Sequence, residues 1–448
     1  MAGRRGNAGL NRPSAKAVIE TAEVVDLDDE GRGVARVQGK AVFITDALPG
    51  EQVEFVRLRQ HRNFDEARLQ SIVTRASDRV EPPCEHFGVC GGCALQHLAP
   101  ERQIEFKERQ LLQALTRIGQ VAPAQVLPPL RGGSLNYRRR ARLGVRWVPK
   151  KNRALVGFRE RNSKFLADIR RCWVLKSPAD QLVGALSDLI TTLQIRDRLP
   201  QIELSVADNA TALVFRVLSP PGDADLEKLQ QFGRDHQVQI FLQPRGYDSI
   251  FALAPPVAPL TYRLPEFAVE LIFEPFDFVQ IHGALNEQMV SQALRLLELR
   301  PEHRVLDLFC GLGNFSLPLA RRAADVVGVE GESGLVERAR ANAIHNGLQN
   351  VNFVTANLFE AAQHGPWSTQ RFDRVLIDPP RAGAREILPW VAQCGASRVV
   401  YVSCHPGSLA RDAGILVKEH GFRLVAAGVM DMFAHTTHVE SMAVFERE

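Results

Sequence analysis

The last third of the chain repeats one pattern, in which an apolar run with strand character is followed by a helical stretch. The five runs are RVLDLF (304–309), DVVGVE (325–330), VNFVTA (351–356), FDRVLID (372–378) and RVVYVS (398–403). Strands that alternate with helices predict a parallel, doubly wound sheet, which binds ligands at the carboxyl ends of its strands. Two final runs, FRLVAAGVM (422–430) and VESMAVFE (439–446), have no helix between them. We therefore expect one antiparallel strand at the edge of the sheet.

The turn after the first of these strands predicts a nucleotide site. Asp307 ends the strand, Gly311 and Gly313 form the turn, and Glu330 ends the next strand 23 residues after Asp307. Glycines let the backbone approach a ligand, and a carboxylate at the second strand end can accept hydrogen bonds from both ribose hydroxyls. A dinucleotide fingerprint would need a third glycine where Ser316 stands. The pattern therefore favours a nucleoside ligand, S-adenosylmethionine above all.

Two more strand ends place reactive side chains at the same edge. Asp378 opens DPPR; an Asp at this place disfavours an amine substrate and suits a ring N–H or a ligand ribose, although a helix N-cap is the alternative. Cys404 follows the fifth strand, near helix amides and basic neighbours. We expect these to lower the pKa of its thiol below about 8.5. The alternative role of Cys404 is that of a small buried residue.

A thiolate and a carboxylate together suit one class of reaction. Carbon 5 of uracil becomes nucleophilic only after sulfur adds to carbon 6, and the carbon-5 proton must then be removed so that the sulfur can leave. We therefore expect Cys404 to be the nucleophile and Glu440, in the last strand, to be the general base. Cys310 and Cys394 lack this setting and are expected to be structural.

The first two thirds of the chain have a different rhythm. Five short strand-like runs within residues 18–75, punctuated by glycines, predict a small closed barrel of the oligonucleotide-binding type. Residues 101–119 have apolar side chains at helical spacing and end in a glycine, so a helix is expected there. Residues 135–274 mix strand-like runs with helical stretches near 178–195 and 223–234, which predicts an α+β platform.

Positive charge is concentrated in one segment. Between Arg131 and Arg171 there are 14 Lys or Arg against two acids, so this segment carries +12 while the whole chain carries only +4. Cations interleaved with aromatic residues are typical of RNA-binding surfaces. We expect the segment to bind RNA, with Arg138, Arg139 and Arg140 among the contacts. The alternative is a solvated basic face over a core of aromatic side chains.

Three cysteines lie close together in the loop CEHFGVCGGC. Cys84, Cys90 and Cys93 have the spacing C-x5-C-x2-C, and Cys172 is a plausible fourth ligand. Four thiolates suit either zinc or an iron–sulfur cluster, but zinc sites usually pair two CxxC knuckles. Three close cysteines and one distant cysteine therefore favour a four-iron cluster, for which a structural role is sufficient.

These residues make the chain resemble the bacterial 23S ribosomal RNA (uracil-5-)-methyltransferases of the RNA 5-methyluridine methyltransferase family, in the type that has a TRAM domain and an iron–sulfur cluster. The resemblance extends over nearly the whole chain. It rests on the cysteine cluster, a TRAM-like region near 14–75, and the motifs FVQ (278–280), DLFCGLGNF (307–315), DPPR (378–381), YVSC (401–404) and HVESM (438–442).

The resemblance implies roles for particular residues. It makes Cys404 the nucleophile and Glu440 the proton acceptor in S-adenosylmethionine-dependent methylation of carbon 5 of a uridine in 23S ribosomal RNA. It implies a [4Fe-4S] cluster on Cys84, Cys90, Cys93 and Cys172, and S-adenosylmethionine contacts from Gln280, Phe309, Asn314, Glu330, Asn357 and Asp378. One departure is visible, because His282 stands where the family usually has Asn.

The predicted architecture is a multidomain α/β protein. Residues 1–13 form a basic flexible arm, 14–75 an OB-like TRAM barrel, 76–274 a central α+β domain with the iron–sulfur cluster, and 275–448 a Rossmann-like, seven-stranded methyltransferase domain. We expect a helix near 98–119 to pack on that last domain. No secretory signal or membrane span is expected, which favours the cytoplasm, and no obligate protein partner is evident.

Two other functions remain open from the sequence. A related enzyme could act on transfer RNA or on a different ribosomal uridine, but the transfer RNA enzymes of the family lack both the TRAM domain and the cysteine cluster. A protein of a different class would bind RNA through the cluster-bearing domains and have no catalytic activity; the intact Cys404 and Glu440 argue against it.

Overall fold

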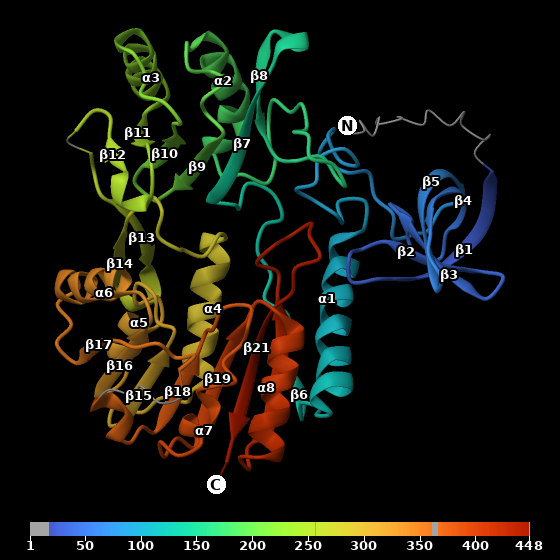
Figure 1. Cartoon of the computed structure of the whole chain (residues 1–448). Helices are drawn as coiled ribbons and strands as arrows, with labels where there is room; N and C mark the ends of the chain where they lie inside the picture. Colours follow the sequence, from blue (N-terminus) through green and yellow to red (C-terminus); the bar gives the residue numbers. More distant parts are fainter. Residues whose placement is uncertain (1–17, 256, 361–365, 448) are drawn as a thin grey trace, which may run out of the picture. The chain divides into compact units, whose positions relative to one another are not determined.

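The computed structural model describes residues 18–255, 257–360 and 366–447 (Figure 1). The predicted arm over 1–13 lies outside the described residues. The chain forms two compact units, one of residues 1–81 with 97–99 and the other of residues 82–96 with 100–448. No helix among the described residues is long and apolar enough to cross a membrane.

The first unit contains a closed five-stranded barrel, which confirms the sequence prediction. Strands β3 and β5 pair in parallel and the other neighbours are antiparallel. Apolar side chains at alternating positions fill its interior, with Val24, Ile44 and Phe55 fully buried. In barrel order the strands are β1 (Ile19–Leu27), β2 (Gly33–Val37), β3 (Lys40–Thr45), β5 (Phe64–Thr74) and β4 (Gln52–Gln60).

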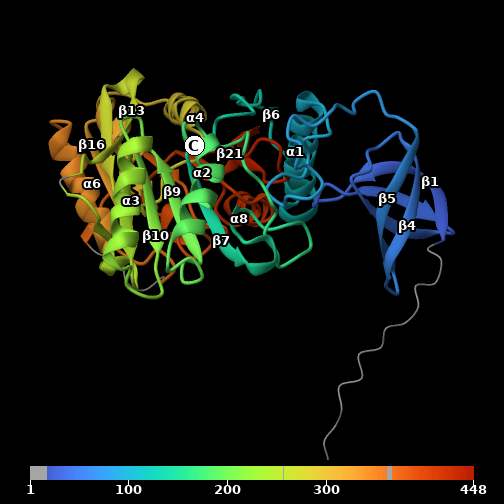
Figure 2. The same ribbon diagram turned by 90° about the horizontal axis from the view of Figure 1, so that it is seen from above.

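The second unit includes the cysteine loop and the long helix α1 (Pro100–Ala114). The last turn of the predicted helix is wound more widely, as a π-helical turn over Leu115–Gly119. Helix α1 lies beside helix α8 (Pro406–Lys418), and their apolar side chains share one core (Figures 1 and 2). A helix from the first third of the chain therefore packs on the C-terminal sheet, as the sequence predicts.

A six-stranded sheet forms the central part of this unit. Helices α2 (Ala179–Thr192) and α3 (Asp223–His236) lie next to each other on this sheet and share its core, as the sequence predicts. The strands in order are β12 (Phe251–Ala252), β11 (Val238–Gln243), β10 (Thr211–Arg216), β9 (Gln201–Val206), β7 (Arg140–Val148) and β8 (Arg153–Gly157).

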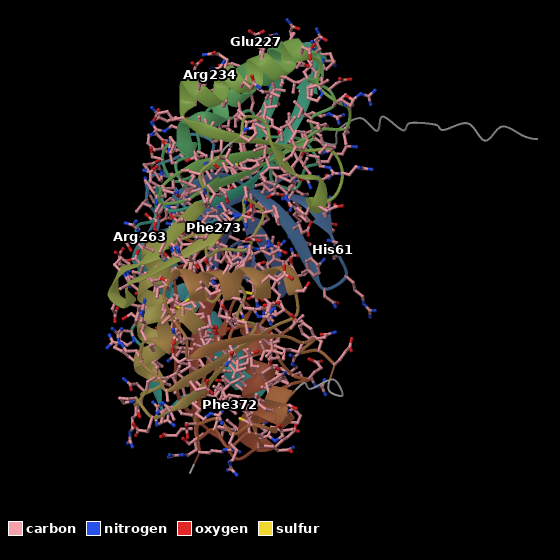
Figure 3. The ribbon with its side chains drawn as sticks, turned by 90° about the vertical axis from the view of Figure 1, so that its left-hand side faces the viewer. His61, Glu227, Arg234, Arg263, Phe273 and Phe372 are labelled. Atoms are coloured by element: carbon pink, nitrogen blue, oxygen red, sulfur yellow. The ribbon has the colours of Figure 1, made fainter. Side chains whose placement is uncertain are left out.

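A two-stranded ribbon, β13 (Leu260–Leu264) and β14 (Val269–Phe273), connects this sheet to the next one. Arg263 is on its exposed side and pairs with Glu270, whereas Phe273 is buried (Figure 3). The second strand coincides with the strand-like run AVELIF (268–273) of the sequence.

The C-terminal sheet has eight strands, and five of them run parallel as predicted. Helices α4 (Gly283–Leu296), α5 (Ser316–Ala320) and α6 (Ser333–His345) contribute to the core on one face. Helices α1, α7 (Leu388–Val391) and α8 contribute to the core on the other face. The strands in order are β17 (Val351–Thr355), β16 (Asp325–Glu330), β15 (Arg304–Leu308), β18 (Arg374–Ile377), β19 (Arg398–Ser403), β21 (Glu440–Glu446), β20 (Arg423–Met430) and β6 (Gln125–Val126).

The position of the antiparallel strand differs from the prediction. Strand β21 is inserted between β19 and β20 and pairs antiparallel with both, so it does not form the edge. The edge is formed by β6, a two-residue strand that pairs parallel with β20 and adds an eighth strand to the predicted seven. Every residue from Glu440 to Phe445 is buried, so the inserted strand is covered on both faces. A local sequence pattern gives no information on which distant strand becomes the neighbour.

Candidate active site

One cavity of about 570 Å³ opens at the carboxyl ends of the parallel strands. Its walls come from the residues that follow β15, β16, β17, β18 and β19, and from the start of β21. All eight residues predicted for catalysis and cofactor binding line this cavity: Gln280, Phe309, Asn314, Glu330, Asn357, Asp378, Cys404 and Glu440.

The turn after β15 includes residues with positive φ, a backbone conformation that most residue types disfavour. Gly311 and Gly313 have φ of +54° and +91°, and Phe309 has φ of +64°, which is uncommon for an aromatic residue. The Glu330 carboxylate accepts hydrogen bonds from the backbone N–H groups of Gly311 (3.1 Å) and Gly331 (2.7 Å). These bonds connect the two strand ends and fix the carboxylate at the cavity wall.

Asn314 has polar partners in the protein. Its Oδ1 accepts hydrogen bonds from Asn286 (2.9 Å) and Tyr262 (3.1 Å), and its amide nitrogen donates to Asn286 (2.9 Å). One N–H therefore remains for a ligand. Asn357, in contrast, is exposed, and its side chain bonds within its own turn, where it accepts from the N–H of Phe359 and donates to Glu360.

Asp307 lies beneath the turn and does not line the cavity. Its side chain is fully buried and accepts a hydrogen bond from the Ser316 hydroxyl. Burial raises the pKa of Asp307 to about 8, with smaller contributions from Asp378 and Glu330. The serine that takes the place of a third glycine thus anchors the aspartate under the turn.

The electrostatics of Cys404 differ from the prediction. Burial raises the pKa of the Cys404 thiol to about 11, and the nearby Glu440 and Asp378 contribute to this rise. Arg381 is the side chain whose positive charge opposes it. The expectation of a thiol pKa below its usual range is therefore wrong for the free protein, because two carboxyl groups and burial outweigh one guanidinium.

The two carboxyl groups are also strongly affected by burial. Burial raises the pKa of Asp378 to about 7. It raises the pKa of Glu440 to about 8, with a contribution from Asp378, while Lys107 and Arg381 act in the opposite direction. Both carboxyls can therefore exchange protons near neutral pH, as a general base must.

Several cavity residues were not predicted. Arg381 donates from Nη2 to His438 Nδ1 at 3.0 Å, and the His438 ring lies 5.3 Å from the ring of Phe433. All three line the cavity, as does Phe278, whose side chain is 70% exposed. The segment DMFAHTTH (431–438), just before β21, contains both His438 and Phe433, and its density of polar and aromatic residues is a usable signal.

The four predicted cluster cysteines line a second cavity, of about 220 Å³. Cys84, Cys90, Cys93 and Cys172 come together there although Cys172 is distant in sequence, and the Gly92 N–H lies 3.4 Å from the Cys90 sulfur. Among the described residues, no three His, Cys, Asp or Glu side chains are close enough to hold a single metal ion. Cys310 and Cys394, expected to be structural, are buried.

The basic segment combines structural and exposed cations. Arg139 is buried and pairs with Asp208 at 2.9 Å, and Arg140 donates to the Pro275 carbonyl at 3.2 Å. Arg138 donates to the Arg140 carbonyl at 2.8 Å. The guanidinium groups of all three arginines thus already have partners within the fold, and contact of these arginines with RNA stays a prediction. Exposed cations lie elsewhere in the segment, at Arg131, Arg146, Lys150, Lys151, Arg159 and Lys164.

Comparisons with known proteins agree with this geometry. Residues 273–448 match the family model described as tRNA (Uracil-5-)-methyltransferase. A protein of Alkalilimnicola ehrlichii is 52% identical over 95% of this chain and 96% of its own length. A protein of Methylococcus capsulatus is 49% identical over 99% of this chain and 100% of its own length. Both carry the name 23S rRNA (uracil(1939)-C(5))-methyltransferase RlmD.

This chain belongs to that family of 23S rRNA uracil-C5-methyltransferases. A solved structure has the same fold: the Pyrococcus abyssi tRNA (uracil-54, C5)-methyltransferase in complex with S-adenosyl-L-homocysteine. Its TM-score is 0.74 at 24% identity, over 95% of this chain and 99% of that chain.

His282, the one visible departure from the family pattern, has a structural role. It is the N-cap of α4: its Nδ1 accepts from the Leu285 N–H at 3.3 Å, and its Nε2 lies 3.0 Å from the Gly133 carbonyl. The ring also stacks on Tyr137, with centroids 4.8 Å apart. An Asn side chain is an equally favourable N-cap, so the cap survives the exchange. His282 is buried and does not line the cavity.

Alkylation of Cys404 by iodoacetamide should follow the charges around it. Glu440→Gln removes a negative charge and should move the midpoint of the labelling rate below the wild-type value of about 11. Arg381→Met removes a positive charge and should move it higher. Mass spectrometry of the Cys404 peptide, labelled over a series of pH values, measures both midpoints. Shifts in the same direction for the two variants would contradict this electrostatic account.

Proposed function

We propose that this protein uses S-adenosylmethionine to methylate carbon 5 of one uridine in 23S ribosomal RNA, the uridine at position 1939 that its relatives are named for. The observation that supports this most directly is a single cavity in which a cysteine and two proton-exchanging carboxyls lie beside a nucleotide-binding turn. Binding of a nucleoside alone requires no thiol at that position.

The first chemical step belongs to Cys404. Its thiolate adds to carbon 6 of uracil, forming a C–S bond, and the electron pair of the 5,6 double bond moves into an enolate. The thiol must first lose its proton. The pKa of about 11 in the free protein already includes the opposing charge of Arg381, which lines the cavity. Ionisation near neutral pH therefore depends on a further change in the charges around the thiol when the substrates bind.

Glu440 completes the reaction. After carbon 5 has been methylated, the Glu440 carboxylate takes the carbon-5 proton. The electrons of that C–H bond restore the 5,6 double bond, and the C–S pair returns to the Cys404 sulfur. A pKa of about 8 places Glu440 close to the pH at which a base both accepts and releases protons readily.

The residues around the turn fit a nucleoside-type methyl donor. Glu330 is fixed by backbone N–H groups at the second strand end, where it can accept from ribose hydroxyls, and Phe309 and Phe359 form an apolar wall with ring centroids 5.7 Å apart. Gln280, Asn314, Asn357 and Asp378 supply the remaining polar groups. When bound there, S-adenosylmethionine supplies the electrophilic methyl group.

The four-cysteine cavity fits a [4Fe-4S] cluster better than a single ion. Four thiols from two distant segments line one space of about 220 Å³. A cubane of iron and sulfide, which is larger than a single ion and takes four cysteine ligands, suits such a space. Cys84, Cys90, Cys93 and Cys172 would hold the cluster and so connect the loop to the central domain.

RNA binding is assigned to the TRAM-like barrel over 14–75 and to the exposed cations of the central domain, 76–274. The catalytic domain is taken as 275–448. The expectation that the barrel excludes a transfer RNA enzyme is wrong, because the fold of the Pyrococcus abyssi tRNA (uracil-54, C5)-methyltransferase matches 95% of this chain. The choice of 23S ribosomal RNA is supported instead by the relatives named for it, which are 49–52% identical over nearly the whole chain. The paired thiol and carboxyls argue against a protein that only binds RNA.

Variants of Cys404 and Glu440 should fail at different steps. Cys404→Ala should form no covalent RNA complex and transfer no methyl group, but should still bind S-adenosylhomocysteine. Glu440→Gln should accumulate a methylated protein–RNA adduct, because elimination slows by about a hundred- to ten-thousandfold without its base. Denaturing gels with labelled methyl donor separate these outcomes. An adduct with Asp378→Asn and none with Glu440→Gln would reverse the roles of the two carboxyls.

Protein purified without oxygen should be brown and contain iron. Cys90→Ser should remove the colour and lower the unfolding temperature, because metal-binding energy contributes to folding energy. Cys394→Ser, a buried cysteine outside the four-cysteine cavity, should retain the colour and serves as the control. Zinc without iron in fresh protein would refute the cluster assignment.

RNA affinity should depend on the exposed cations of the basic segment. Replacing Arg146, Lys150 and Lys164 by Gln should weaken binding and reduce the slope of log K against log salt by about 0.7–0.9 for each phosphate that is no longer neutralised. Arg234→Gln, on the exposed face of α3, is the matched control (Figure 3). Equal slopes for the triple variant and the wild type would mean that the segment is a solvated face.

A further inference from the structure

Helix α1 carries a lysine on its buried side. The Lys107 side chain is 0% exposed, and among the described residues it is the only buried lysine. Its ammonium donates to Asp431 Oδ1 at 2.6 Å and to the Phe433 carbonyl at 3.0 Å. A buried charge is costly unless it is paired, so this contact fixes both partners in place.

The partners of Lys107 lie directly beside the general base. Asp431 follows Met430, and Met430 is the register partner of Glu440 in the β20–β21 pair. Phe433 lines the catalytic cavity. Lys107 therefore holds the start of the segment 431–439 that leads from β20 to Glu440. Its charge is close enough to Glu440 that each influences the pKa of the other.

Segment 431–439 has a second set of contacts, with the residues that follow the cysteine loop and with another residue of α1. The His435 carbonyl accepts from the N–H groups of Ala94 (2.9 Å) and Leu95 (3.0 Å), and the His435 N–H donates to Gln103 Oε1 at 3.1 Å. These contacts do not involve the ammonium group. Removing the charge of Lys107 therefore tests its electrostatic effect without releasing the whole segment.

We propose that Lys107 is a positioning residue for Glu440: it fixes the 431–439 segment and supplies a buried positive charge that favours the carboxylate form of the general base. This inference rests on the proposed function. The charge matters at elimination, where a Glu440 oxygen takes the carbon-5 proton while the C–S pair returns to Cys404. A Glu440 that is already protonated cannot perform that step.

Other charged groups face the same carboxyl and set the sign of the expected effect. Glu440 faces Asp378, which raises its pKa, and Arg381, which lowers it. Cys404 lies on the neighbouring strand end and is itself affected by Glu440. Lys107 faces Asp431 and influences His435 and His438. Asp431 partly neutralises Lys107. Removing the charge of Lys107 should therefore raise the pKa of Glu440, and removing the charge of Asp431 should lower it.

The experiment measures decay of the methylated covalent adduct against pH in single-turnover reactions with an RNA fragment and labelled methyl donor. Lys107→Met should slow decay about tenfold or more at neutral pH and move the rising limb of the profile to higher pH. Asp431→Asn should move this limb to lower pH. Lys107→Arg should restore a limb close to that of the wild type, and Arg109→Met, an exposed position of α1, should leave it unchanged.

The outcomes separate this inference from the proposed function. Failure of the wild type to form any Cys404-dependent adduct would refute the function itself. If the wild-type adduct decays normally and Lys107→Met shows an unshifted limb, only the role of Lys107 is refuted. The same conclusion follows if the limbs of Lys107→Met and Asp431→Asn shift in the same direction. If Lys107→Met does not fold, as judged by S-adenosylhomocysteine binding, the limb of Asp431→Asn decides: a shift to lower pH supports the role, and no shift or a shift to higher pH overturns it.

Discussion

The parallel direction of five strands is the constraint on which the site depends. Each strand of β15–β19 delivers its following residue to the same edge, so side chains up to about a hundred residues apart in sequence meet without any local relationship. Strand β21 is the exception that completes the site, because it runs in the opposite direction. Its first residue, Glu440, rather than its last, therefore lies at that edge, opposite Cys404 on the neighbouring strand end.

Burial at this edge has an electrostatic cost that the rest of the site must offset. It raises the pKa of Asp378, Cys404 and Glu440 together, so the cavity disfavours every anion that the reaction needs. Fixed cations are the physical remedy, and they come from outside the strand ends. Arg381 lies in the loop after β18, and Lys107 comes from α1. A helix far away in sequence is therefore connected to the chemistry.

The sequence predicted the residues of the site better than their energetics. Strand ends and glycine turns are local signals, so all eight predicted cavity residues lie in one cavity. The pKa of Cys404 depends on burial and on carboxyls from two other strands, which no local pattern reports. Arg139 was expected on the surface because its partner in the fold, Asp208, is distant in sequence. Lys107 left a faint signal, as a charge on the apolar stripe of an amphipathic helix with Ile104 and Leu111.

The cysteine loop has a mechanical connection to catalysis that needs no electron transfer. Ala94 and Leu95 directly follow Cys93, and both donate backbone hydrogen bonds to His435 in the segment that ends at Glu440. A ligand that fixes Cys93 therefore also fixes these two donors, and with them the path of the chain into the catalytic strand. Glycine-rich loops lose much conformational entropy on ordering, and this loop contains Gly91 and Gly92 immediately before Cys93. Binding of the proposed cluster would offset that cost in the loop that supports the segment leading to Glu440.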